Sequence, residues 1–117
     1  MKKENIVKDK SLNFAIRIVN LYKYLVAEKR ETVMSKQLLR CGTSIGANIR
    51  EAEQAQSRAD FLNKQNIALK EANEAEYWLE LLMKTEYMTP KEYENINADC
   101  TELNKLLISI IKSTKLN

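Results

Sequence analysis

Residues that break regular backbone structure are nearly absent from this chain, which contains two glycines and one proline among 117 residues. A β-rich domain of this length would need many more of them for its turns. The abundance of leucine, isoleucine, alanine, glutamate and lysine instead favours long helices. With 44% hydrophobic and 30% charged residues, the chain can bury a core without metals or disulfides. We therefore predict an all-α fold.

Apolar residues recur at helical spacing in four segments, which short polar stretches separate. Thr89, Pro90 and Glu92 supply an N-cap, a proline at the first helical position and the reciprocal glutamate of a capping box. Ser57 and Asp60 resemble a second capping box, with aspartate in place of glutamate. The predicted helices cover about residues 10–28 and 34–54, and two more begin near Ser57 and near Thr89.

The connections between these helices are short, so neighbouring helices are expected to run in opposite directions. The predicted architecture is an antiparallel up-down-up-down four-helix bundle. Its length suits one domain over residues 1–117, with a flexible polar lead-in at residues 1–9.

The first helix carries two adjoining apolar stripes, which is more apolar surface than one bundle core usually takes from one helix. We assign the first stripe to the core. We interpret the second as a candidate subunit interface. The core stripe comprises Leu12, Ala15, Ile16, Val19, Tyr22 and Val26, and the interface stripe comprises Phe14, Ile18, Leu21 and Leu25.

The sequence lacks the side chains that most enzymes of this size rely on. It contains no histidine, which removes the usual general base and the usual transition-metal ligand. It has no glycine-rich phosphate loop. Cys41 and Cys100 are far apart among apolar residues, where buried reduced thiols are expected rather than a zinc site. We predict no enzymatic activity, no cofactor and no metal.

One enzymatic alternative stays open. Glu71 and Glu74 lie one turn apart on the third helix, and Asp99 and Glu102 lie one turn apart on the fourth. If these helices bring the two pairs together, four carboxylates could bind Mg²⁺ and support nucleotide hydrolysis.

A seam of polar residues follows one side of the second helix, at the edge of its core stripe. Polar groups in such a position need partners, since an unsatisfied buried amide costs about 1–3 kcal/mol. Glu71 and Glu74 on the third helix could pair with Arg40 and Asn48. We interpret the set as a structural network that fixes helix register, with a ligand site as the alternative. The network comprises Gln37, Arg40, Ser44, Asn48, Glu71 and Glu74.

The net charge of +3 is mildly basic, and no single helix face is uniformly basic. An oligomer would repeat each small basic patch and could build a surface that binds phosphates. The candidate phosphate contacts are Lys2, Lys3, Lys112 and Lys115. No signal peptide and no apolar run of about 20 residues is evident, so we expect a cytoplasmic protein without membrane contact.

The second helix also carries a pattern typical of a known family. It resembles the small four-helix-bundle proteins encoded by intervening sequences of bacterial 23S ribosomal RNA genes, whose hallmark is Gln-x-x-Arg-x-x-x-Ser-Ile-x-x-Asn-Ile-x-Glu. The matching positions are Gln37, Arg40, Ser44, Ile45, Asn48, Ile49 and Glu51. Asp60-Phe61 and the run at residues 68–72 continue the similarity. Ala52 departs from the glycine that many members carry after the glutamate.

This resemblance implies a four-helix bundle that assembles into a ring, most commonly a pentamer. It implies no established activity. The family is encoded within ribosomal RNA genes, and it is distantly similar to basic bundle proteins that bind nucleic acid and assist a reverse transcriptase. Both points favour a role with RNA. The leading hypothesis is a non-enzymatic homo-oligomer that binds RNA or a protein partner. The alternatives are a purely structural or protein-interaction module and the magnesium-dependent hydrolase.

Overall fold

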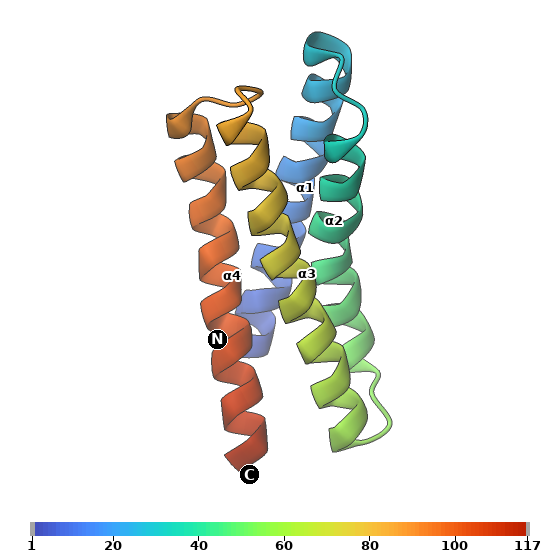
Figure 1. Ribbon diagram of the computed structural model, residues 1–117. Coiled ribbons are helices and arrows are strands. Elements are labelled where there is room, and N and C mark those ends of the chain that lie inside the picture. The colour runs from blue at the N-terminus through green and yellow to red at the C-terminus, as the bar shows by residue number, and fades with distance from the viewer. Residues whose placement is uncertain (1, 117) are drawn as a thin grey trace.

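The computed structural model describes residues 2–116 and confirms the all-α, antiparallel four-helix bundle. Neighbouring helices run alternately up and down, and the two ends of the chain lie at the same end of the bundle (Figure 1). The molecule is elongated, with extents of 47 × 22 × 21 Å. The helices are α1 (Lys3–Lys29), α2 (Met34–Glu53), α3 (Arg58–Lys84) and α4 (Pro90–Leu116).

Helix α1 begins at Lys3, well before the predicted start near Lys10. The expected polar lead-in at residues 1–9 is therefore helical from Lys3 onward. Two contacts hold this turn to the bundle: Val7 is fully buried in the core, and the Lys8 ammonium lies 3.1 Å from the Glu53 carboxylate of α2. Ile6 and Val7 are the apolar residues of this charged segment, and two adjacent residues show no helical spacing.

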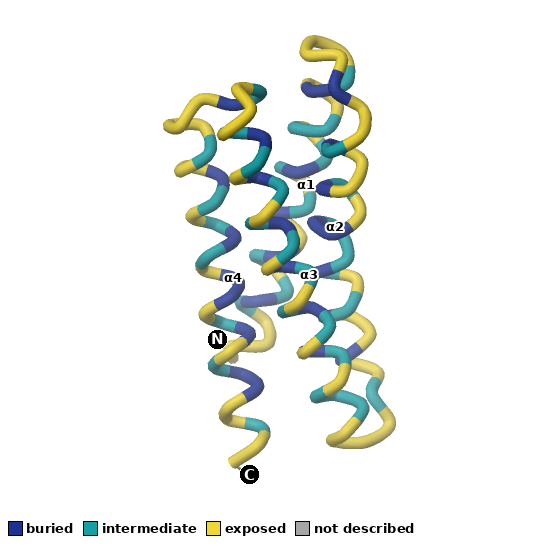
Figure 2. Tube along the Cα trace, in the orientation of Figure 1, coloured by how far each residue is buried: buried dark blue, intermediate teal, exposed yellow. Residues whose placement is uncertain are grey.

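The two apolar stripes of α1 exchange the roles that the sequence analysis gave them. Phe14, Ile18 and Leu25 are at most 1% exposed and belong to the core, so the prediction that they form a subunit interface is wrong. Leu21 of the same stripe is half-buried against the core. Leu12 and Ile16, assigned to the core, are 46% and 51% exposed. Figure 2 shows the buried faces of all four helices turned inward.

A glycine on α2 explains which stripe of α1 faces inward. A Cβ atom at Gly42 would lie 2.9 Å from two side-chain carbons of Ile18, closer than real Cβ atoms come to a neighbour. One turn later, a Cβ at Gly46 would lie 3.2 Å from the Ser11 hydroxyl. The two glycines therefore let α1 approach α2 closely along the side that carries Ser11 and Ile18.

Two free thiols lie inside the bundle. Cys41 and Cys100 are fully buried, and the Cys100 thiol donates to the carbonyl of Ala72 at 3.2 Å. Burial, followed by the charge of Glu74, raises the pKa of Cys41 to about 12. Burial likewise raises the pKa of Cys100. Both side chains act as small apolar groups rather than as nucleophiles.

The turn between α1 and α2 is held by a buried carboxylate. Arg30 ends α1 in the left-handed conformation with φ of 57°, which turns the chain toward α2. Glu31 is 6% exposed, and its carboxylate accepts from the backbone N–H groups of Val33, Met34 and Ser35 at 2.7–3.0 Å. The side chain therefore satisfies three of the free N–H groups at the start of α2.

Burial alone would raise the pKa of Glu31, but these N–H groups and the Ser35 hydroxyl outweigh burial and hold that pKa below its ordinary value. The sequence predicted only a polar connection in this turn.

The capping signals of the other two turns form as hydrogen bonds. The Thr89 hydroxyl accepts from the N–H of Glu92 at 3.1 Å, and the Glu92 carboxylate accepts from the N–H of Thr89 at 2.8 Å. At the start of α3, the Ser57 hydroxyl accepts from the N–H of Asp60 at 3.0 Å. The Asp60 carboxylate accepts from the N–H of Gln56 instead of the N–H of Ser57.

Candidate functional site

A charged cluster closes the surface between α2 and α3. The Arg40 guanidinium lies 3.3 Å from the Glu71 carboxylate, forms a second ion pair with Glu74, and donates to the Gln37 side-chain oxygen at 3.3 Å. The Trp78 indole N–H donates to the same Glu74 carboxylate at 2.9 Å. One guanidinium thus ties two turns of α3 to α2, and an indole N–H holds one of its carboxylate partners.

Two members of the predicted network lie apart from this cluster. The Ser44 hydroxyl donates to the Arg40 carbonyl at 2.6 Å, and the Asn48 amide donates to the Ser44 carbonyl at 2.8 Å. Both side chains bond to the backbone of their own helix, so the expected pairing of Asn48 with a glutamate of α3 is not found. In the cluster of Gln37, Arg40, Glu71 and Glu74, one guanidinium pairs with both carboxylates across the two helices, which is the arrangement of a structural clamp.

The four carboxylates of the magnesium alternative face different neighbours. Glu71 and Glu74 turn toward α2, where Arg40 holds them. Asp99 and Glu102 turn toward α1, where Asp99 lies 2.6 Å from Arg17 and Glu102 lies 2.9 Å from Lys10. In the part of the chain that the structure describes, no three acidic or thiol side chains gather as metal ligands. The geometry that the alternative required does not form.

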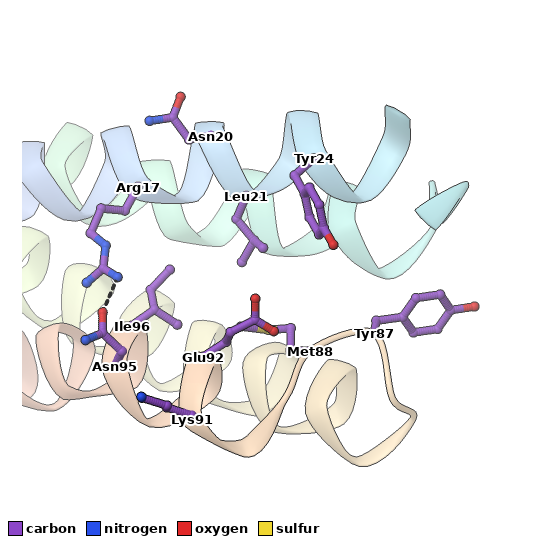
Figure 3. Close-up of a pocket in the computed structure, with 10 residues that line it drawn as sticks. All are labelled: Arg17, Asn20, Leu21, Tyr24, Tyr87, Met88, Lys91, Glu92, Asn95 and Ile96. Carbon is purple, nitrogen blue, oxygen red and sulfur yellow. Dashed lines mark hydrogen bonds between the residues drawn. The ribbon is translucent and has the colours of Figure 1, made fainter. Parts of the chain in front are cut away.

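A groove of about 480 Å³ opens between α1 and the start of α4. Figure 3 shows Leu21 and Tyr24 of α1 on one wall, facing Met88 and Ile96 across the gap. Ile96 and Met88 are nearly buried, so they form an apolar floor, while Tyr24 is 43% exposed. No sequence pattern predicted this groove, because its walls come from segments that are far apart in the chain.

Polar groups close the end of the groove that lies at the left in Figure 3. Arg17 donates to the Asn95 side-chain oxygen at 2.5 Å and also pairs with Asp99, so one side chain bridges α1 and α4 (Figure 3). Lys91 and Glu92 lie on the α4 wall, where Glu92 is already engaged in its capping box. The groove therefore combines an apolar floor with a rim of mixed charge.

The third feature is a group of lysines at the end of the bundle where the chain begins and ends. We call Lys2, Lys3, Lys105, Lys112 and Lys115 the basic end; it contains all four candidate phosphate contacts. Contacts across helices hold this end together, because the Lys3 ammonium donates to the Ser109 hydroxyl at 2.5 Å and Arg58 donates to the Thr114 carbonyl.

The lysines of the basic end are exposed, and none of them forms an ion pair with another residue in 2–116. Acidic residues are absent from α4 after Glu102. Lys2 and Lys3 lie at the N-terminus of α1, where the helix dipole favours acids over bases. Their position therefore works against the local stability of the helix, which Glu4 in the same turn favours, and the two lysines keep a positive excess at this end.

Comparisons with known proteins agree with this architecture. The family model for the 23S rRNA-intervening sequence protein matches residues 3–109. A crystal structure at 1.70 Å of a protein of unknown function from the S23 ribosomal protein family, from Bacteroides thetaiotaomicron VPI-5482, is 77% identical. It covers 95% of this chain and 99% of its own, with a TM-score of 0.94. No curated protein matches. Because the family match spans nearly the whole chain, the protein belongs to the 23S rRNA-intervening sequence protein family, as the pattern on α2 predicted.

Proposed function

We propose that this protein is a non-enzymatic, cytoplasmic homo-oligomer that binds RNA through its basic end. The observation that carries the proposal is the basic end itself: five exposed lysines without acidic partners among the described residues, gathered from α1 and α4. Positive charge of this kind binds phosphates and releases counterions from the nucleic acid. Membership of a family named for intervening sequences of 23S rRNA makes RNA the first ligand to test.

An apolar stripe on the outside of α1 supports the oligomer. Leu12 and Ile16 lie one turn apart and are 46% and 51% exposed, and the half-buried Val19 follows them at helical spacing. Exposed apolar residues in a row are typical of an interface between proteins. We propose that a second copy covers this stripe and that the copies close into a ring, which the family resemblance expects to contain five. The proposed interface is therefore the outward stripe of α1, in place of the inward stripe predicted from the sequence.

RNA binding is tested by fluorescence anisotropy with a labelled structured RNA at several salt concentrations. Affinity should fall steeply as salt rises. Lys105, Lys112 and Lys115 are changed together to Gln; this triple variant should lower the dependence of log K on log salt by about 2 to 3, since each phosphate contact contributes about 0.7–0.9. A matched triple variant at the other end, with Lys23, Lys36 and Lys84 changed to Gln, removes the same charge and should bind like the parent. Equal losses in both variants, or affinity that ignores salt, would contradict binding at the basic end.

Assembly is tested by light scattering on the purified protein. The parent should have a mass several times that of one chain, and Ile16→Glu should dissociate it, because a charge cannot be buried unpaired in the interface. Lys70→Glu, a charge change on an exposed residue of α3, the helix that does not contact α1, serves as the control and should leave the mass unchanged. A parent protein that is monomeric at all concentrations would refute the oligomer, and a mass unaffected by Ile16→Glu would exclude this stripe as the interface.

A further inference from the structure

We infer that the RNA bound at the basic end is double-stranded, and that the protein contacts its phosphates rather than its bases. This inference rests on the proposed function and specifies its ligand. It follows from which side chains the basic end contains, which it lacks, and how the charges are spaced.

The basic end lacks the side chains that bind single strands. Proteins that bind single-stranded RNA stack its bases on exposed aromatic rings, and that stacking offsets the cost of ordering a flexible strand. In this half of the bundle, Phe14 is buried in the core and Phe61 packs against it. The exposed aromatic residues, Tyr24 and Tyr77, lie on the parts of α1 and α3 near the opposite end. A single strand would gain charge contacts here without any stacking.

The lysines of α4 form a row along one helix. Lys105 and Lys112 are seven residues apart on α4, which places them on one face of the helix, about 10.5 Å apart along its axis. Lys115 continues this row in the last turn. A duplex carries about one negative charge per 1.7 Å of its axis, as measured for DNA, so a fixed row of this length faces several phosphates without any ordering of the ligand.

The type of cation points the same way. All five residues of the basic end are lysines, which offer a compact charge, whereas arginine offers a planar group that stacks on bases and reads their edges. Two arginines lie at the same end of the bundle: Arg58 donates to the Thr114 carbonyl and so holds the start of α3 to the end of α4, and Arg50 lies in the last turn of α2, a helix that does not contact α4. Recognition by shape and phosphate contacts is the usual mode for double-stranded RNA.

The test compares two RNAs of equal length and composition: one forms a fully paired hairpin, and the other has the same nucleotides in an order that does not pair. Dissociation constants are measured by anisotropy over a range of salt concentrations. The hairpin should bind at least tenfold more tightly. Similar affinity for both RNAs, or preference for the unpaired strand, would overturn the inference while RNA binding itself stands. Failure of both RNAs to bind would overturn the proposed function, and this inference with it.

Paired variants locate the effect. Lys105→Gln with Lys112→Gln should remove most of the preference for the hairpin, whereas Lys36→Gln with Lys84→Gln should keep it. Thermal unfolding followed by circular dichroism checks that each variant is folded, which is expected because all four lysines are exposed. A hairpin preference that survives in the first variant and disappears in the second would place duplex binding elsewhere on the molecule.

Discussion

Two seams of the bundle, α2–α3 and α1–α4, are built in opposite ways. The α2–α3 contact is the most extensive between neighbouring helices, and the α1–α4 contact is the least extensive. Helix α3 faces the core with Ala68, Ala72 and Ala75, all fully buried, and small side chains let helices approach closely. Arg40 then clamps the edge of this seam. At the α1–α4 seam, larger side chains line the open groove, which ends at Arg17.

The difference shows that one bundle can be tightly packed on one side and loose on another. Regions with few buried contacts open locally at lower free energy than the rest of a protein. The α1–α4 seam is therefore the part of the molecule that is expected to open first, and the α2–α3 side is expected to carry most of the global stability. Matched substitutions on the two sides test this comparison.

The largest difference is expected between two leucines. Leu79 on α3 is fully buried, and Leu79→Ala should cost about 2–5 kcal/mol of unfolding free energy, because it removes buried methyl groups and leaves a cavity. Leu21 lines the groove, so Leu21→Ala leaves a site that water already reaches and should cost about 1 kcal/mol. Urea unfolding measures both. Equal losses would mean that the groove side is packed as tightly as the core.

The next prediction separates close helix packing from helix propensity. Alanine favours a helix over glycine by about 1 kcal/mol, so Gly46→Ala, which meets a small hydroxyl, should be neutral or stabilising. The same substitution at Gly42 pushes against the fully buried Ile18, and overpacking of this kind costs about 1–3 kcal/mol. Gly42→Ala should therefore lower the thermal midpoint while Gly46→Ala does not. If both variants gain stability, α1 and α2 can move apart to accept the added methyl group at Gly42, and close packing at this position is not required.

The turn that joins α1 to α2 makes a smaller, pH-dependent contribution. The pKa of Glu31 is lower in the folded protein than its ordinary value near 4.5. Its stabilisation is therefore complete above that value and is lost as the pH falls through the folded pKa. At pH 7, Glu31→Gln should cost about 1 kcal/mol, as for the loss of a helix cap, and this difference should shrink in acid. Glu28→Gln, on an exposed residue of the preceding turn, is the control. A difference that stays constant from pH 7 to pH 3 would exclude the capping role of the charge.

The sequence predicted the helices well because each carried local signals. Apolar spacing gave their number, the short connections gave their alternating direction, and the capping box at Thr89 and Glu92 gave the start of α4. The pattern on α2 gave the family, and Arg40 does lie against Glu71 and Glu74.

The sequence predicted less well where the answer depends on a second helix. Both stripes of α1 have helical spacing, and the choice between them depends on the space that Gly42 leaves for Ile18. The groove depends on segments from α1 and α4 that no local pattern relates. In the sequence, Glu31 is one charged residue of a polar connection. Its role depends on three backbone N–H groups that the folded turn directs toward its carboxylate.

The smallest prediction concerns the two arginines that bridge the seams. Arg40→Gln leaves Glu71 and Glu74 one turn apart and partly buried, so their repulsion adds to the lost ion pairs, and the cost should be about 1 kcal/mol. Arg17→Gln removes an ion pair with one carboxylate, which is more exposed than Glu71 or Glu74, and should cost about 0.5 kcal/mol or less.

The two variants should differ more clearly in where they loosen the protein. In Arg17→Gln, amide hydrogen exchange should rise around Asn95 in the first half of α4. Arg17 and Asn95 close one end of the groove, and the groove is already open next to them. In Arg40→Gln, the amides on the alanine-lined side of α3 should stay protected from hydrogen exchange, because packing rather than charge holds α3 against the core. Raising the salt concentration to about 1 M should reduce both stability differences by screening. If exchange rises along α3 in Arg40→Gln and stays unchanged at Asn95 in Arg17→Gln, the charged clamp, and not the small side chains, closes the α2–α3 seam.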